Sequence, residues 1–326
     1  MDNKTILITG GTGSFGQAFI RLLLTRHHPE KVIVFSRDEW KQWEMQRSDP
    51  LFASPQMRYF LGDVRDKERL ARAFNGVDYV VHAAALKQVP AAEYNPTEFI
   101  KTNVDGAMHV IDASVDLGVK RVIALSTDKA VNPVNLYGAT KLCSDKLFVA
   151  ANAYAGKRGY PRFSVVRYGN VLGSRGSVAA MWREQVERGA DHLTVTDPRM
   201  TRFWISLEQA AEFVLESFLR MEGGEIFVPK IPSMKLVDLA EAIAPKMEKR
   251  FTGIREGEKL HELLISREEG ERTYAFPTYY AISHPLAHGK LDEALEAQGG
   301  ERVGDFIYAS DTNGEWLNPS QICEGA

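Results

Sequence analysis

Cysteine is scarce in this sequence, neither sign of charge dominates, and long apolar runs are missing. The 326 residues include two cysteines, Cys143 and Cys323, which excludes a disulfide framework and a cysteine-based zinc site. We therefore expect a reducing compartment and no bound metal. The 40 basic and 43 acidic residues give a net charge of −3, which argues against a dedicated nucleic-acid binder and against a basic membrane-surface protein.

The start of the chain has too few apolar residues for a secretory signal. The apolar run from Thr5 to Thr9 ends at glycines, whereas a signal peptide needs ~7–15 apolar residues after a basic start. No stretch of the sequence approaches the ~18–20 apolar residues that span a bilayer. These absences predict a cytoplasmic protein without a membrane partner.

Short β-branched runs alternate with longer amphipathic stretches through the first two thirds of the chain. The runs predict strands at residues 6–9, 32–36, 58–61, 79–82, 121–126 and 163–167, and the stretches predict helices at residues 17–26, 66–74, 98–117 and 137–155. Apolar strands separated by helices indicate an α/β protein with a parallel sheet covered on both faces, the doubly wound Rossmann arrangement.

The pattern becomes irregular after about residue 175. Helical stretches at residues 178–188, 208–220 and 235–244 are interrupted by turn-forming prolines and glycines. The chain is roughly twice as long as an average domain of ~150 residues, which fits a division into two parts. We expect a dinucleotide-binding domain over residues 1–175 and a smaller, mixed substrate lobe over residues 176–326. The two parts are expected to pack closely, and crossovers of the chain between them stay open.

A glycine-rich turn follows the first predicted strand and opens the first helical stretch. Gly10, Gly13 and Gly16 fit a GxxGxxG pattern, and Gly11 with the last two fits GxGxxG. Such glycines let the backbone approach a pyrophosphate, which the N–H groups and the dipole of the helix start then bind. This context favours a dinucleotide site over a plain tight turn. The residues expected to contact the cofactor here are Gly10, Thr12, Gly13, Ser14, Phe15 and Gly16.

The end of the second strand favours NADP over NAD. An NAD site would place an acidic residue there to bind the ribose 2′-hydroxyl, but this sequence has Ser36 and Arg37, which can bind a 2′-phosphate. Asp38 and Glu39 follow one step further into the loop and weaken the argument. The alternative is that Arg37 is a solvated loop charge.

The ends of the next two strands supply further cofactor residues. Asp63, followed by Val64, can accept a hydrogen bond from the adenine amino group. Ala83 belongs to a run of three alanines after the fourth strand, and such small residues let the backbone lie close to the cofactor.

A reactive tyrosine and lysine are predicted on one helix face. The fifth strand leads to Asp128 and Lys129, and Tyr137 and Lys141 follow at positions i and i+4 of a helix. A nearby ammonium lowers the pKa of a phenol, so Tyr137 can exchange a proton with a substrate alcohol. The same Lys141 can bind the nicotinamide ribose. A YxxxK pattern is common by chance, and its weight comes from its place after the fifth strand.

With these motifs the chain resembles the extended short-chain dehydrogenases/reductases, and within them the inverting UDP-N-acetylglucosamine 4,6-dehydratases that begin pseudaminic acid synthesis. The segments that carry the resemblance are SRDE (36–39), HAAALKQVP (82–90), STDKAVNPVNLYGATK (126–141), RYGNVLGSRGSV (167–178), MTRFWIS (200–206), EIFVPKIPSMK (225–235) and GEKLHE (257–262). The resemblance covers nearly the whole chain. It implies a tightly bound NADP that is recycled within each turnover, and a homo-oligomer.

The resemblance also implies a role for each member of the Asp128–Lys129 pair. Most retaining sugar 4,6-dehydratases carry aspartate and glutamate there, whereas lysine at the second position is typical of the inverting family. Lys129 is then the base at C5 of the sugar, Asp128 the acid toward the C6 hydroxyl, and Tyr137 with Lys141 acts at the C4 hydroxyl. The implied product is UDP-2-acetamido-2,6-dideoxy-β-L-arabino-hex-4-ulose. Judged from the residues alone, a plain ion pair of Lys129 with Asp128 or with a phosphate is the stronger interpretation.

The same resemblance assigns a set of residues to the UDP-sugar. These are Lys87, Thr127, Asn170, Arg175, Ser177, Val178, Thr194, Arg202, Arg255, Glu258 and Lys259. Arg202 and Arg255 are the best candidates for the diphosphate, because a guanidinium fork matches phosphate oxygens. Lys87 follows the fourth strand closely enough to reach both the nicotinamide ribose and the sugar. The alternative is that these arginines are surface charges.

Four other functions compete with this interpretation. A UDP-N-acetylglucosamine 4-epimerase needs no Asp128–Lys129 pair, and a retaining 4,6-dehydratase is expected to carry glutamate at position 129. A non-enzymatic NADP sensor usually loses the tyrosine or the lysine of the YxxxK pair, and both are present. A dehydrogenase for a small alcohol needs no elaborate C-terminal lobe.

Overall fold

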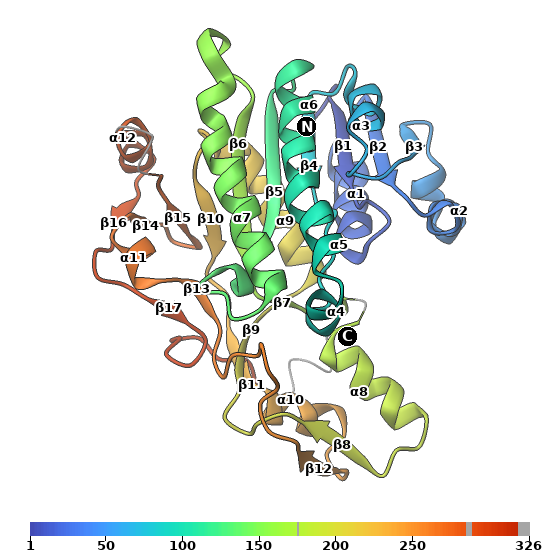
Figure 1. Ribbon diagram of the computed structural model, residues 1–326, viewed down its shortest axis with the longest axis vertical. Helices are drawn as coiled ribbons and strands as arrows, with labels where there is room; N and C mark the ends of the chain where they lie inside the picture. Colours follow the sequence, from blue (N-terminus) through green and yellow to red (C-terminus); the bar gives the residue numbers. More distant parts are fainter. Residues whose placement is uncertain (175, 285–288, 319–326) are drawn as a thin grey trace.

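A large twisted sheet runs through the centre of the molecule (Figure 1). The computed structural model describes residues 1–174, 176–284 and 289–318. Within this part of the chain, ten strands form the sheet in the order β16-β14-β15-β10-β6-β5-β4-β1-β2-β3. The strands from β10 to β3 are all parallel, whereas β15, β14 and β16 are antiparallel. The order reverses between β1 and β4, which is the switch point at which a Rossmann sheet binds its ligand. The predicted fold class is confirmed.

The strands of the large sheet have the following bounds: β1 Thr5–Thr9, β2 Lys31–Ser36, β3 Met57–Leu61, β4 Tyr79–His82, β5 Arg121–Thr127, β6 Arg162–Tyr168, β10 Ile226–Pro229, β14 Thr273–Ala275, β15 Tyr279–Ile282 and β16 Glu301–Arg302. The central strands are buried on both faces; in β1, for example, Ile6, Leu7 and Ile8 are fully buried. This explains why these strands are continuous apolar runs rather than alternating ones.

Helices cover both faces of the sheet. On one face lie α3 Lys67–Phe74, α6 Gly106–Asp116 and α7 Leu136–Ala150, with α6 and α7 in front of the sheet in Figure 1. On the other face α1 Ser14–Arg26 packs against α9 Leu207–Arg220. The helix predicted at 98–117 is divided into α5 Pro96–Ile100, a π-helical turn Lys101–Asp105 and α6. The helix predicted at 137–155 ends at Ala150 and continues as a 3-10 helix, Ala151–Arg158.

A smaller lobe lies below the sheet in Figure 1 and has a core of its own. Its elements are β7 Asn170–Val171, α8 Val178–Glu187, β8 His192–Val195, β9 Thr201–Ile205, β11 Ser233–Lys235, α10 Leu236–Ile243 and β12 Glu248–Phe251. Strands β11, β9 and β7 form one small sheet, and β12 pairs with β8. Trp182 and Trp204 fill the centre of this core.

The chain passes between the two cores several times. After the first part of the lobe it returns to the large sheet as α9 and β10, and after β12 it returns as β14, β15 and β16. The parallel pairing of β6 with β10 requires a crossover connection, and residues 169–225 of the lobe and α9 supply it. The large sheet therefore draws strands from both sides of residue 175.

The remaining elements are short. They are α2 Glu39–Ser48, the 3-10 helix Pro50–Ala53, α4 Val89–Tyr94, the 3-10 turn Asp128–Ala130, β13 Leu263–Ile265, α11 Arg267–Gly270, α12 Lys290–Ala297 and β17 Tyr308–Ala309, which pairs with β13. Among the residues that the structure describes, no helix has the length and apolarity to cross a membrane. The same residues contain no group of three or more His, Cys, Asp or Glu side chains suited to a metal ion.

Candidate active site

The glycine-rich turn between β1 and α1 is held tightly against the end of β4. Gly10 has a φ of +68°, and a side-chain carbon there would lie 2.9 Å from the backbone of Ala84. The predicted residues Gly13, Ser14, Phe15 and Gly16 form the N-cap and first turn of α1. Only a residue without a side chain fits at position 10 in this conformation. The turn thus offers a bare backbone and a helix start, which is the surface that a pyrophosphate needs.

A hydrogen-bonded pair joins β1 to β4 beneath this turn. The hydroxyl oxygen of Thr9 accepts from the backbone N–H groups of Ala83 and Ala84, each at 3.2 Å, and lies 2.9 Å from Nδ1 of His82. Burial and the charge of Lys141 lower the pKa of His82 to about 3, so its ring is neutral. The pair fixes the Ala83–Ala84 backbone beside Gly10, where the sequence predicted close contact with a cofactor.

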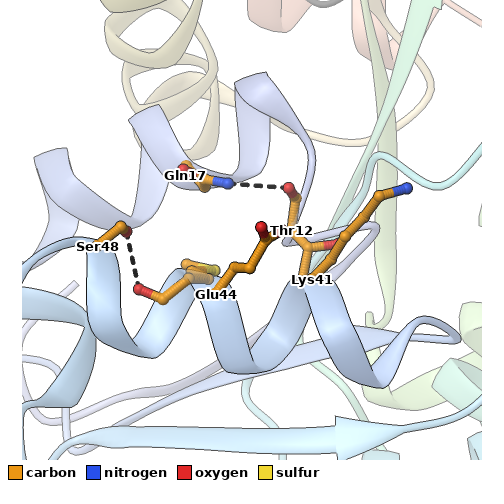
Figure 2. Close-up of a pocket in the computed structure, with 6 residues that line it drawn as sticks. Thr12, Gln17, Lys41, Glu44 and Ser48 are labelled. Carbon is orange, nitrogen blue, oxygen red and sulfur yellow. Dashed lines mark hydrogen bonds between the residues drawn. The ribbon is translucent and has the colours of Figure 1, made fainter.

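A hollow of about 220 Å³ lies between the glycine-rich turn and α2 (Figure 2). Figure 2 shows Thr12 and Gln17 on one side and the α2 residues Lys41, Glu44 and Ser48 on the other. Gln17 donates from Nε2 to the carbonyl oxygen of Thr12 at 3.0 Å. The hollow places a lysine and a threonine near the end of β2, where the sequence predicted the 2′-phosphate.

The acidic residue after Arg37 caps the helix that follows it. Asp38 is the N-cap of α2; its carboxylate accepts from the backbone N–H of Lys41 at 3.0 Å and lies 3.2 Å from the Nζ of that residue. The hydroxyl of Ser36 accepts from Nε2 of Gln42 at 3.0 Å, so its own proton can be donated elsewhere. The Asp38 carboxylate is thus held by the start of α2 and by the Lys41 side chain.

Asp63 lies within reach of two arginines. Its carboxylate is 2.7 Å from Arg65 and 3.7 Å from Arg37. Partial burial would raise the pKa of Asp63, but the hydrogen bonds and charge of Arg65 outweigh it and hold the pKa below its usual value. Arg37 is more than half exposed, so it can turn toward a ligand.

The predicted catalytic pair lies in the 3-10 turn that follows β5. Asp128 is fully buried, and its Oδ1 accepts from the Thr127 hydroxyl at 2.9 Å and from Nζ of Lys129 at 3.0 Å. Its Oδ2 is buried and has no hydrogen-bond partner among the described residues. The carboxyl group therefore has a free oxygen inside the site.

The start of α7 is clamped onto this turn. Asn135 caps the helix by accepting from the backbone N–H of Gly138 at 2.8 Å, and its amide donates to the carbonyl oxygen of Gly257 at 2.8 Å. Both interactions place Tyr137, which is 9% exposed, close to the end of β5. The helix cap and the close packing at Gly138 explain why a tyrosine in the first turn of α7 meets Thr127.

The electrostatic surroundings of Tyr137 differ from those predicted. Burial raises the pKa of Tyr137 to about 12, the charge of Lys129 and a hydrogen bond with Thr127 oppose that rise, and Asp128 adds to it. The expected net lowering of this pKa is wrong, because burial outweighs the groups that favour the phenolate. The Nζ of Lys141 donates to the carbonyl oxygen of Leu125 at 2.7 Å. Burial lowers the pKa of Lys141, although the nearby Asp145 opposes this effect.

Lys129 lies between two buried carboxylates. Its Nζ is 3.0 Å from Oδ1 of Asp128 and 3.4 Å from Oε1 of Glu262. Burial by itself would lower the pKa of Lys129, but the two carboxylates outweigh it and raise the pKa above its usual value. Glu262 in turn lies 3.5 Å from Nζ of Lys259 and 3.8 Å from Nε of Arg202. The structure thus brings together predicted residues from both parts of the chain.

Arg202 has a different environment from the one expected of a diphosphate ligand. Its Nη1 and Nη2 atoms donate to the backbone carbonyl oxygens of Thr201, Leu260 and Lys259 at 2.7–3.0 Å. These bonds hold the segment 259–262 against β9. The guanidinium is 9% exposed.

The other predicted substrate residues are spread along the lobe. Ser177 caps α8, which begins at Val178, and Thr194 lies in β8. Asn170 lies in β7, and its buried Oδ1 has no hydrogen-bond partner among the described residues. Arg255 is 57% exposed and lies 3.9 Å from Glu258. Arg175 lies outside the described residues.

Lys87 follows β4, and its charge interacts with that of Lys129 in the catalytic turn. Partial desolvation and the charge of Lys129 lower its pKa. The preceding residue, Leu86, is fixed by Asn103, whose side chain accepts from the Leu86 N–H at 2.8 Å and donates to the Leu86 carbonyl oxygen at 2.9 Å. Asn103 also donates to Thr140 of α7 at 3.0 Å, so the predicted cofactor loop and the catalytic helix share one buried anchor.

Comparisons with known proteins agree with this geometry. Residues 6–284 match the model of the family described as "Polysaccharide biosynthesis protein". The chain belongs to this family. It is 56% identical over 328 residues to a protein of Campylobacter jejuni named UDP-N-acetylglucosamine 4,6-dehydratase (inverting), and the match covers 99% of this chain and 97% of that protein. The resemblance that the motifs indicated is confirmed.

Other relatives of this chain carry different names. A Rickettsia felis protein named UDP-glucose 4-epimerase is 43% identical over 330 residues, with 99% of this chain and 95% of that protein covered. Among solved structures, Pen from Bacillus thuringiensis matches with a TM-score of 0.88 and 34% identity over 99% of this chain and 97% of that one. DesIV, a dTDP-glucose 4,6-dehydratase from Streptomyces venezuelae with NAD and TYD bound, matches with a TM-score of 0.70 and 25% identity over 78% of this chain and 86% of that one.

Three residues of the candidate active site were missed in the analysis of the sequence. Asn135 carried a recognisable signal, because it directly precedes a helical stretch and asparagine is a favoured N-cap. Lys41 and Thr12 line the same hollow, and this follows from tertiary structure rather than from local sequence. Glu262 was part of the quoted GEKLHE segment, but its distance from Lys129 along the chain hid their contact.

Proposed function

We propose that this protein is an inverting UDP-N-acetylglucosamine 4,6-dehydratase. The observation that carries the proposal is the buried Asp128–Lys129 pair beside Tyr137, with Lys129 Nζ 3.0 Å from Asp128. A base and an acid so close to a tyrosine suit removal of the C5 proton and departure of the C6 hydroxyl, steps that a simple epimerase does not need. The name and the near full-length match of the Campylobacter jejuni relative support the same activity.

We infer that the cofactor is NADP. The bare backbone at Gly10 and the start of α1 suit a pyrophosphate, and Ser36, Arg37 and Lys41 suit a 2′-phosphate at the end of β2. When bound, the nicotinamide would supply reversible hydride exchange with the sugar. We propose that NADP stays tightly bound and is recycled within each turnover.

The proton steps follow from the side chains. Tyr137 takes the proton of the C4 hydroxyl on its phenolic oxygen, and the charge of Lys129 and the hydrogen bond with Thr127 favour the phenolate that this requires. A ketone at C4 acidifies the C5 proton. Transfer of the Nζ proton of Lys129 to Asp128 leaves a neutral amine that can remove this proton and a carboxylic acid that can protonate the departing C6 hydroxyl. One transfer over 3.0 Å thus prepares both groups.

The substrate lobe is proposed to hold the UDP moiety. Arg255 is exposed and suits a phosphate oxygen. Asn170 has a buried amide oxygen without a partner among the described residues, and this oxygen can accept a hydrogen bond from a ligand. Lys259, whose pKa is lowered by burial, donates to the carbonyl oxygen of Val131 at 2.5 Å and braces the catalytic turn. Thr194, Ser177, Val178, Glu258 and Lys87 stay predictions as substrate contacts.

Proton NMR of the purified protein with UDP-N-acetylglucosamine in deuterated water, without added cofactor, tests the proposal. A 6-deoxy methyl signal, deuterium at C5 and L-arabino couplings are expected. A D-xylo product would retain the dehydratase activity and contradict the inverting role of Lys129. UDP-N-acetylgalactosamine without a methyl signal would mean a 4-epimerase, which the names of the Rickettsia relatives make the second candidate.

We propose that the product is used to make pseudaminic acid or a related surface glycan. We also propose that the enzyme is a cytoplasmic homo-oligomer. Light scattering after size-exclusion chromatography tests the assembly, and the mass expected of a monomer would contradict it. The supply of pseudaminic acid is tested by deleting the gene and analysing the surface glycans of the cells.

A further inference from the structure

Glu262 is a buried carboxylate at the junction of the two parts of the molecule. It precedes β13, and its side chain is 3% exposed. Its backbone is pinned to Ser310, because its N–H donates to the Ser310 hydroxyl and its carbonyl oxygen accepts from the Ser310 N–H, each at 2.9 Å. The carboxylate is therefore presented to its neighbours from a fixed backbone.

The carboxylate of Glu262 joins the catalytic turn to the substrate lobe. Oε1 lies 3.4 Å from Nζ of Lys129 and 3.8 Å from Nε of Arg202, and Oε2 lies 3.5 Å from Nζ of Lys259. Lys259 also donates to the carbonyl oxygen of Val131, directly after the catalytic turn. Lys129 thus has a second anchor besides its chain neighbour Asp128.

We propose that Glu262 is a positioning residue for the base at C5: its carboxylate aligns the Nζ atom of Lys129 through their ion pair. A lysine side chain with four rotatable bonds that contacts only the preceding residue can pivot, whereas contacts with two buried carboxylates restrict its amine to one place. The assignment of Lys129 as a base rests on the proposed function. The alignment by Glu262 is a property of the protein without substrate.

Several charges act on Lys129, and they differ in sign. The groups that interact with it are Asp128, Glu262, Arg202, Lys87, Lys259 and Tyr137. Burial and Arg202 oppose the charged form of Lys129, and the two carboxylates favour it. Removing the charge of Glu262 leaves Asp128 as the one carboxylate near this amine within the described residues, so the balance moves toward the neutral amine.

The first test measures Lys129 directly and needs no substrate. Protein labelled with carbon-13 at the lysine Cε atoms is titrated by NMR, and the Lys129 signal is assigned from the variant K129R. We expect Lys129 to release its proton at lower pH in E262Q, so that its signal shifts toward the neutral form below pH 11 while the wild-type signal does not. A Lys129 signal that stays as protonated in E262Q as in the wild type at every pH up to 11 overturns the proposal.

The second test follows turnover. In E262Q, the fall of kcat at high pH is expected to move to lower pH, because loss of the proton that Lys129 and Asp128 share leaves no acid for the C6 hydroxyl. E262D keeps the charge and is expected to keep the pH dependence while losing alignment and hence kcat. E241Q is the matched control, since Glu241 of α10 is exposed and pairs with Lys249 of β12; it should behave as the wild type.

The two tests separate the possible failures. A uniform loss of kcat in E262Q with an unchanged pH profile means a purely structural residue and overturns the inference. If the wild-type protein forms no dehydrated product, the proposed function fails, and the NMR titration still decides whether Glu262 controls Lys129. Should E262Q not fold, kcat of E262D decides: a loss of kcat at an unchanged Tm supports the alignment by Glu262, and a kcat equal to that of the wild type overturns it.

Discussion

Gly138 lies directly against the carbonyl oxygen of Lys129: a side-chain carbon at position 138 would be 2.2 Å from that oxygen. This contact lets the first turn of α7 approach the catalytic turn closely enough for Tyr137 to reach Thr127. A glycine in a helix ordinarily costs stability compared with alanine, by about 1 kcal/mol. Its presence here is explained by the close approach of two backbones.

The variant G138A is expected to lower both stability and activity, although alanine ordinarily stabilises a helix more than glycine does. The added carbon has to push α7 away from Lys129, because the atom it meets is backbone and cannot rotate aside. We expect a fall in Tm and a loss of kcat of at least tenfold, measured by thermal unfolding and by NMR of product formation.

The exposed Cys143 on the same helix offers a control for G138A. C143A should leave both Tm and kcat at their wild-type values. A G138A protein that is as active and at least as stable as the wild type would contradict the proposed role of this contact.

The sequence predicted the parts of the site that depend on local pattern. The glycine-rich turn, Tyr137 and Lys141 could be found because their spacing relates them to one strand or one helix. The partners of Lys129 could not be found in this way, since Glu262 is far along the chain and reaches the site only through the return of the chain after β12. The shift of the Tyr137 pKa was predicted with the wrong sign, because the burial that raises this pKa depends on tertiary packing.

The domain boundary shows the same contrast between features that follow from local sequence and features that depend on tertiary structure. The strands up to β6 follow one another in sequence with helices between them, and periodicity therefore reveals them. β10 and α9 belong to the large core, yet a stretch of lobe separates them from β6. Local pattern carries no information on which core a later strand joins.

The choice of cofactor is tested by removing the positive charges near the end of β2. R37A and K41A are each expected to weaken NADP binding by about tenfold while leaving NAD binding unchanged, because one charge-assisted contact to a 2′-phosphate is lost. Fluorescence titration of the cofactor-free protein with both nucleotides measures the two Kd values.

Arg47 supplies the matched control on α2. Its guanidinium lies over the ring of Trp43, 4.7 Å from the centroid, and it is not among the residues that line the hollow of Figure 2. R47A should leave both Kd values unchanged. Equal weakening of NADP and NAD by R37A and K41A would mean that neither residue recognises the 2′-phosphate.

Glu225 is expected to make stability depend on pH. It is 1% exposed, and burial raises its pKa from 4.5 to about 7, although the N–H groups of Glu222 and Gly223 donate to it. The folded protein therefore binds a proton here that the unfolded chain has already released, so this contribution to stability is present at pH 4.5 and is lost as the pH rises to about 7. The loss amounts to about 3 kcal/mol.

Denaturant unfolding of the wild type and E225Q between pH 4.5 and 7.5 measures this contribution. The wild type should lose stability relative to E225Q by about that amount across the interval, because glutamine does not titrate. Taking the difference cancels other groups, among them the buried His82, whose lowered pKa acts in the opposite direction. A difference that stays constant with pH would show that Glu225 ionises normally.

Lys129 is best tested by a substitution that keeps its charge. Arginine retains the ion pairs with Asp128 and Glu262 but does not lose its proton at accessible pH, and so it cannot accept the proton from C5. We expect K129R to lower the rate of product formation by about 10²–10⁴-fold, the usual contribution of a general base, and to lower deuterium incorporation at C5 equally. Tm should stay near that of the wild type, because the buried carboxylates remain paired. NMR in deuterated water measures both rates, and K129R turning over within tenfold of the wild type would assign the base to another residue.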